Sequence, residues 1–279
     1  MNRDQPEREE VLSYQVHNGV GYWQPKGIPQ PAGVVCAFSS RQGGISEGPF
    51  GSLNLGLHVG DEPGCVLENR QRFSRALGVD PRHWVAAQQV HGCNVAVVSQ
   101  KHRGLGAYSQ KTALCGTDGL VTAEAGVWLS CYYADCVPLV FWDSLRGAIG
   151  IAHAGWRGTL ANIGVCVVRQ MVSSFGCEAQ DLQVLIGPAI GACCYVVGEE
   201  VAMAFEKRLG QGSLSHRHGR SYLDLRAANR ELIVEAGIPP DQIHVSNLCT
   251  ACHPEAFFSH RRDGSPTGRM TAIIGLREQ

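Results

Sequence analysis

The chain has 279 residues, of which 44% are hydrophobic and 18% charged, and its 24 basic and 25 acidic residues give a formal net charge of −1. This composition is typical of a globular enzyme with one large or two small domains. A near-neutral chain without a basic block gives no reason to expect a nucleic-acid partner, and no apolar run reaches the roughly 18 residues that would predict a membrane span.

The first ten residues are polar and of mixed charge, which is not the pattern of a secretory signal. We therefore expect a cytoplasmic protein whose twelve cysteines stay reduced. Most of them should be small buried residues, and a minority should bind metal or do chemistry.

Residues 1–33 are expected to be a poorly ordered lead-in, because Pro25, Pro29 and Pro31 interrupt any regular element there. Regular structure is predicted to start at Val34, and residues 34–279 to form a single domain. A helix over residues 69–77 should end at Gly78.

The middle of the chain predicts strands at residues 127–133, 139–142 and 148–152. The first two are nearly continuous apolar runs, which indicates burial on both faces. A turn around Asp143 and Ser144 would join the last two strands into a hairpin.

A helix is predicted over residues 159–174, because an apolar stripe recurs every three or four positions and Gly176 follows. Further elements are a strand at 182–186, helices at 199–209 and 225–236, and strands at 243–245 and 270–274. The polar residues 211–221 are expected to be a surface loop. Strands and helices mix without strict alternation, so the predicted fold class is α+β.

The most informative residues for chemistry are His91, Cys136 and His153, each of which lies beside glycine or proline. Two imidazoles and one thiolate would supply three ligands of a tetrahedral zinc and leave the fourth position open, as in catalytic zinc sites. Sequence spacing cannot show that the three meet, so packed residues with no ligand role are the alternative. If the segment is extended, Asp135 points away from its neighbour Cys136 and has a structural role.

A second cysteine motif is Cys249-Thr250-Ala251-Cys252-His253, which has the spacing of covalent haem attachment. Haem attachment is excluded because no export signal is present. A zinc ribbon would need a second cysteine pair at suitable spacing, which we do not expect. The neighbouring pair Cys193-Cys194 is geometrically poor for a disulfide. The motif is therefore interpreted as a thiol-containing loop.

Arg41, Arg157 and Arg262 lie in glycine-rich turns, where a guanidinium can bind phosphate or carboxylate. The alternative is that each is solvated or braces its loop. No Walker loop, dinucleotide fingerprint or Gly-x-Ser-x-Gly elbow is present.

Twelve segments carry a resemblance in order along the chain: residues 38–44, 52–56, 58–61, 89–92, 117–122, 134–138, 153–158, 186–188, 193–195, 249–250, 258–264 and 267–270. Together they resemble the YfiH-type laccase-domain family, also described as purine nucleoside phosphorylase or polyphenol oxidase. The resemblance implies a four-layer α/β/β/α sandwich with mixed sheets. It also implies a catalytic zinc held by His91, Cys136 and His153. The sequence departs from the family pattern at two positions: His260 stands where the family usually has Tyr, and Pro266 precedes Thr267. Both departures affect the arginine-rich loop.

The implied activity is phosphorolysis of adenosine, inosine, guanosine or methylthioadenosine, and deamination of adenosine. Nucleoside and phosphate would then be the partners, of a monomer or homodimer. Candidate substrate-binding residues are Arg41, Asn54, Arg157 and Arg262.

Three alternatives remain open. Cys136 could be the nucleophile of an amide hydrolase that edits cell-wall precursors, with His153 or His91 as base. Copper in place of zinc would suit a polyphenol oxidase, although the one His-x-His pair is His216-Arg217-His218. A metal-stabilised binding protein is the third.

Overall fold

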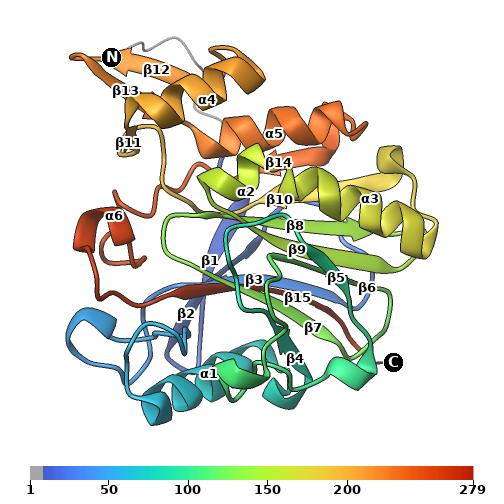
Figure 1. The fold of residues 1–279 in the computed structure, drawn as a ribbon. Coiled ribbons are helices and arrows are strands. Elements are labelled where there is room, and N and C mark those ends of the chain that lie inside the picture. The colour runs from blue at the N-terminus through green and yellow to red at the C-terminus, as the bar shows by residue number, and fades with distance from the viewer. Residues whose placement is uncertain (1–8, 279) are drawn as a thin grey trace.

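The computed structural model describes residues 9–278, which form three β-sheets and six α-helices (Figure 1). The mixture agrees with the α+β class expected from the sequence. The helices are α1 (Pro63–Leu77), α2 (Trp156–Leu160), α3 (Ile163–Phe175), α4 (Glu199–Leu209), α5 (Leu225–Glu235) and α6 (His260–Asp263).

The first sheet has the order β1-β2-β3-β15-β7-β4, and the second has the order β14-β10-β8-β9-β6-β5. Most neighbouring strands are antiparallel, but β4–β7, β5–β6 and β10–β14 are parallel. The strands of the first sheet are β1 (Leu12–His17), β2 (Val20–Pro25), β3 (Val34–Ser39), β15 (Met270–Leu276), β7 (Trp128–Tyr133) and β4 (Trp84–Ala86). Those of the second are β14 (Ile243–Val245), β10 (Leu182–Ile186), β8 (Val137–Asp143), β9 (Ala148–Ala154), β6 (Gly119–Thr122) and β5 (Val95–Val97).

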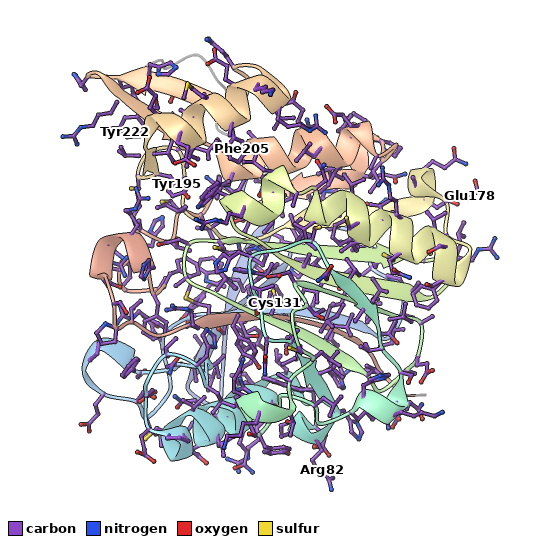
Figure 2. All side chains as sticks on the ribbon, viewed as in Figure 1. Arg82, Cys131, Glu178, Tyr195, Phe205 and Tyr222 are labelled. Atoms are coloured by element: carbon purple, nitrogen blue, oxygen red, sulfur yellow. The ribbon has the colours of Figure 1, made fainter. Side chains whose placement is uncertain are left out.

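Every residue of β7, β8 and β9 is buried, as the apolar runs predicted for β7 and β8. The reason is that successive side chains of a strand enter different cores. In β8, Leu139 and Phe141 belong to one apolar cluster with α3 and α5, whereas Val140 and Trp142 belong to another cluster that includes residues of β7 and β15. Figure 1 shows α3 and α5 over the second sheet and α1 against the first, and Figure 2 shows Cys131 in the interior.

The expectation that regular structure begins at Val34 was wrong. Strands β1 and β2 precede it and extend the first sheet, so the described part of the lead-in is ordered as a hairpin. The turn is Asn18-Gly19, with positive φ at both residues, which is the two-residue turn that matches strand twist. Residues 1–8 of the expected lead-in lie outside the described residues.

Two other expectations need correction. Residues 211–221 contain a second hairpin, β12 (Leu214–Arg217) and β13 (Arg220–Leu223), which pairs with β11 (Val196–Val197). The helix expected over 159–174 is divided into α2 and α3, because Asn162 adopts a left-handed conformation (φ 63°) that a continuous helix does not allow.

Candidate metal centre

The β8–β9 hairpin places Cys136 and His153 together. Pro138 pairs with His153 in the register of these strands, and Cys136 precedes β8 by one residue, so both side chains stand at the open end of the hairpin. His91 reaches the same end from the loop between β4 and β5.

Asp118 connects these segments. Its carboxylate accepts hydrogen bonds from the backbone N–H groups of Val90 (3.1 Å), His91 (3.0 Å) and Gly92 (2.8 Å). Asp118 directly precedes β6, which pairs with β9, and the backbone N–H of His153 donates to the carbonyl of Asp118 at 2.8 Å. One buried aspartate therefore fixes the His91 loop, in which His91 has a φ of 62°, beside His153.

The potential ligand atoms of His91, Cys136 and His153 all lie within 4.8 Å of one another. The two imidazole rings meet edge to face, with centroids 4.8 Å apart and an interplanar angle of 77°. The structure thus brings together the three residues that sequence spacing alone could not connect. Their roles as zinc ligands and as catalytic residues stay a prediction.

Asp118 is also the residue that orients the His153 ring. Its Oδ1 lies 3.1 Å from Nδ1 of His153. Metal-binding histidines usually donate their second ring N–H to such a carboxylate, which fixes the tautomer and leaves the other nitrogen to bind the ion. Asp118 was not among the predicted site residues, and the signal for it in the sequence was its place in the Thr117-Asp118-Gly119 segment.

The donor set has the electrostatics of a metal-binding group. Burial alone would raise the pKa of Cys136, but the charge and hydrogen bond of His153, together with His91, lower that pKa to about 6. Burial opposes the charged form of His153, yet Cys136 and Asp118 raise its pKa to about 9. A low-pKa thiol beside imidazoles is the form in which cysteine binds metal or attacks carbon.

The backbone of Gly155 passes close to the three side chains and leaves no room for a side chain of its own. A Cβ at this position would stand 2.8 Å from Cδ2 of His91 and 3.1 Å from Sγ of Cys136. Both distances are shorter than ordinary contacts, so a side chain at Gly155 would displace the donors. His91 is exposed, Cys136 is half-buried and His153 is buried, so the group is open to solvent on the His91 side.

His58 and Arg269 lie near the trio, and the sequence analysis did not single them out. A Cβ on Gly56 would touch both side chains, which places them side by side. The His58 side chain is exposed, but desolvation by the protein atoms around it, followed by the charges of Arg269 and Arg70 and of the two site histidines, lowers its pKa to about 4. His58 is therefore neutral at pH 7 and can donate or accept a hydrogen bond next to the open side.

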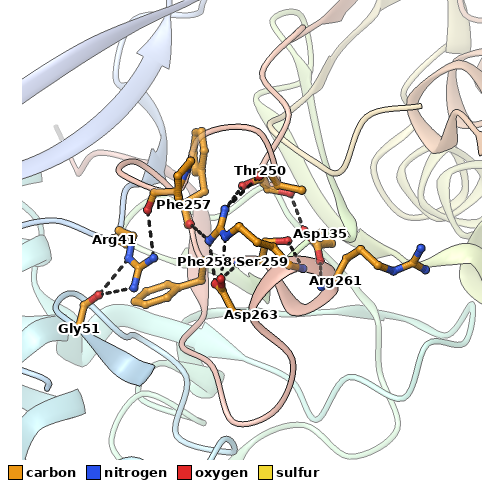
Figure 3. Close-up of polar contacts among 12 residues, drawn as sticks. Arg41, Gly51, Asp135, Thr250, Phe257, Phe258, Ser259, Arg261 and Asp263 are labelled. Carbon is orange, nitrogen blue, oxygen red and sulfur yellow. Dashed lines mark hydrogen bonds and ion pairs between the residues drawn. The ribbon is translucent and has the colours of Figure 1, made fainter. Parts of the chain in front are cut away.

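The residues predicted to bind substrate are placed differently from one another, and Figure 3 shows one of them, Arg41, beside Gly51 and Phe258. Arg41 donates to the carbonyls of Gly51 and Pro254, at 2.8–3.0 Å, and stacks on Phe258. Arg262 donates to the carbonyls of Thr250, Ala251 and Phe257 and pairs with Asp263. Both arginines brace loops.

Asn54 is buried, and its amide is engaged with Gly56, Asp61 and the backbone N–H of Arg269. Arg157 is exposed and lies over the Trp156 ring, and within residues 9–278 its guanidinium has no hydrogen-bond partner. Of the four, Arg157 is thus the one whose donors remain available to a ligand.

Asp135 has a structural role, although the extended backbone on which that expectation rested is absent at this residue. Its φ of 88° turns the chain just before Cys136. Its carboxylate accepts hydrogen bonds from the Thr250 hydroxyl (2.6 Å) and the backbone N–H of Arg261 (2.7 Å) (Figure 3). Asp135 therefore ties the Cys136 segment to the 249–252 loop and to α6.

The expectation that the Cys249-x-x-Cys252 motif lacks a second cysteine pair was wrong. Cys193 and Cys194 lie against it, and the four sulfur atoms are within 4.8 Å of one another. The two cysteine pairs are more than fifty residues apart in the sequence, a separation outside the spacing rules for zinc ribbons, and the fold brings them together.

Three comparisons connect the chain to known proteins. The family described as multi-copper polyphenol oxidoreductase laccase matches residues 35–277. The chain is 44% identical over 261 residues to the purine nucleoside phosphorylase YlmD of Geobacillus stearothermophilus, an alignment that covers 92% of this chain and 95% of the relative. It is 39% identical over 240 residues to the adenosine deaminase RL5 of an unknown prokaryotic organism, covering 84% and 91%. The crystal structure of YlmD from Geobacillus stearothermophilus superposes with a TM-score of 0.91 at 42% identity, over 96% of this chain and all of that one.

Proposed function

We propose that this chain, which belongs to the family described as multi-copper polyphenol oxidoreductase laccase, is a zinc-dependent purine nucleoside enzyme. Its reactions would be phosphorolysis of adenosine, inosine, guanosine or methylthioadenosine, and deamination of adenosine. The names of its relatives support the substrate class. The observation that carries the proposal is the convergence of His91, Cys136 and His153 with one ligand exposed.

The residues fit a zinc ion. Two imidazoles, a low-pKa thiol and a carboxylate behind one imidazole are the donors that catalytic zinc sites use. When bound, zinc would supply a Lewis acid and an activated water at neutral pH. Among residues 9–278, one metal-capable group contains histidine, which does not favour a multi-copper centre.

The chain's own residues would hold and orient the substrate. Asp118 keeps the His153 ring fixed, so the ligand group does not reorganise when a nucleoside enters. The free guanidinium of Arg157 can bind phosphate oxygens. Neutral His58 can hydrogen-bond the base or the ribose on the open side.

The test is chromatography of products after incubation with adenosine, with and without phosphate. Adenine that requires phosphate would establish phosphorolysis, and inosine without phosphate would establish deamination. The Cys136→Ala variant should make neither product, while Cys115→Ser, a change at an exposed cysteine, should behave as wild type. Full turnover by Cys136→Ala would refute the proposal.

A second candidate is an amide hydrolase with a cysteine nucleophile, because Cys136, His153 and Asp118 are connected like a nucleophile, its base and an orienting carboxylate. Activity that survives complete chelation but is lost on thiol alkylation would favour this candidate. Copper in natively purified protein would instead favour phenol oxidation.

We also propose the finer architecture, a four-layer α/β/β/α sandwich, which three separate apolar clusters support. Within residues 9–278, no helix is long and apolar enough to span a membrane. A cytoplasmic location stays a prediction, supported by twelve cysteines that form no disulfide in the described structure. The monomer or homodimer is likewise a prediction.

A further inference from the structure

A second cluster of sulfur donors lies outside the His91/Cys136/His153 group. It consists of Cys193, Cys194, Cys249 and Cys252, whose four sulfur atoms lie within 4.8 Å of one another. Sγ of Cys252 is 3.5 Å from that of Cys193 and 3.4 Å from that of Cys194. The cluster joins the loop after β10 to the loop before α6, segments that are more than fifty residues apart.

These distances fit a four-thiolate metal site. A tetrahedral zinc with Zn–S bonds of about 2.3 Å requires sulfur atoms about 3.8 Å apart. The two shortest-range contacts given above, 3.4 and 3.5 Å, lie slightly below this value, all four sulfur atoms lie within 4.8 Å, and both contacts are much longer than the roughly 2.05 Å of a disulfide. Four thiolates in tetrahedral arrangement select zinc or iron, and a single ion held by cysteines alone is typical of structural zinc.

The surroundings of Cys249 match those of a metal-bound thiolate. Its sulfur accepts a hydrogen bond from the backbone N–H of Gly191 at 3.2 Å. Backbone N–H groups directed at a thiolate stabilise its negative charge.

A positive side chain is also close. A Cβ on Gly191 would stand 3.1 Å from both the Arg226 guanidinium and Sγ of Cys193, so glycine lets the two approach each other. Arg226 is anchored by the carbonyls of Ser246 and Leu248. Four thiolates around a divalent ion carry a net charge of −2, which a neighbouring arginine stabilises.

We propose that Cys193, Cys194, Cys249 and Cys252 bind one structural Zn²⁺, separate from the ion proposed for the histidine site. The ion fastens the 191–195 segment to the 249–252 loop. Its binding releases the thiol protons and involves no redox step.

This site would support the histidine site through a short path. Thr250 follows Cys249 and donates to the Asp135 carboxylate, and Asp135 precedes Cys136. On the other side, Tyr195 follows Cys194 and carries the Arg261 guanidinium 4.8 Å from its ring centroid. Figure 2 shows Tyr195 in the region between α4 and α6. Loss of the ion should therefore loosen Asp135 and α6 without removing any ligand of the histidine site.

The experiment is a zinc count per chain, by elemental mass spectrometry, on protein purified under reducing conditions without chelator. Wild type should hold two zinc ions. Cys252→Ser and Cys136→Ala should hold one each, and the double variant none. Cys115→Ser, at an exposed cysteine outside the cluster, is the matched control and should keep two.

A second readout does not depend on the Cys252→Ser variant, because it keeps all four cysteines of the cluster. Cobalt in the Cys136→Ala protein should give strong thiolate-to-cobalt charge-transfer absorption, which disappears when zinc is added back. One zinc per wild-type chain with all thiols titratable would overturn the proposal. So would an intact mass that shows a disulfide within the cluster, or iron as the bound metal.

Discussion

Replacement of Asp118 by Asn changes one atom of the buried carboxylate and removes its charge. In the wild type, Oδ1 accepts from the His91 backbone N–H and lies next to Nδ1 of His153, while Oδ2 accepts from Val90 and Gly92. Asparagine has one oxygen, so in either orientation its NH₂ group faces two former donors.

The expected cost follows from those contacts. Hydrogen bonds to a charged acceptor contribute about 1.5–3 kcal/mol each, so the loss of two should lower the free energy of unfolding by about 3 kcal/mol or more. If the NH₂ group faces Nδ1 of His153, the ring must change tautomer, and its other nitrogen then carries the proton. Loss of an orienting carboxylate weakens metal affinity about 10- to 100-fold.

Two measurements separate these effects. Urea unfolding of metal-free Asp118→Asn reports stability, and competition with a chromophoric chelator reports zinc affinity. The titration is made in the Cys252→Ser background, so that only the histidine site is measured. Asp143→Asn is the matched control, because Asp143 is also buried and accepts from two backbone N–H groups. It lies at the far end of β8, about 20 Å of strand from Cys136, and should leave zinc affinity unchanged. Unchanged affinity in Asp118→Asn, with reduced stability, would refute the orienting role.

Four further changes test other contacts. Gly155→Ala places a methyl group 2.8 Å from the His91 ring and should reduce bound zinc at the histidine site, measured by elemental analysis; unchanged zinc content would contradict this. Arg157→Ala should raise the KM for phosphate and leave the melting temperature unchanged. Arg41→Ala should lower the melting temperature, because three hydrogen bonds to backbone carbonyls are lost. A raised KM in Arg41→Ala together with a lowered melting temperature in Arg157→Ala would exchange their roles. Arg70→Met should destabilise the fold by about 3 kcal/mol or more in urea unfolding, because this fully buried guanidinium serves three backbone carbonyls that methionine leaves unpaired.

The sequence by itself determined the family, the α+β class and most of the secondary structure. Continuous apolar runs gave β7 and β8, and Gly78 and Gly176 marked helix ends with left-handed residues. These signals are local, because side-chain periodicity and the conformational freedom of glycine act within a few residues. The Asn18-Gly19 turn was a local signal of the same kind, and the proline residues around it obscured the hairpin.

Tertiary structure decided which distant side chains meet. Strand register brought Cys136 beside His153, and Asp118 carried the His91 loop to them, a role that no spacing rule indicates. The same is true of the four cysteines, which two loops from separate parts of the chain assemble. Arg41 and Arg157 both lie in glycine-rich segments, so the sequence does not distinguish them. The tertiary structure decides that Arg41 braces a loop and that Arg157 stays free. Such contacts depend on how the strands pair and how the sheets pack. That packing cannot be predicted from a short segment, because all helices and strands together bury the apolar surface.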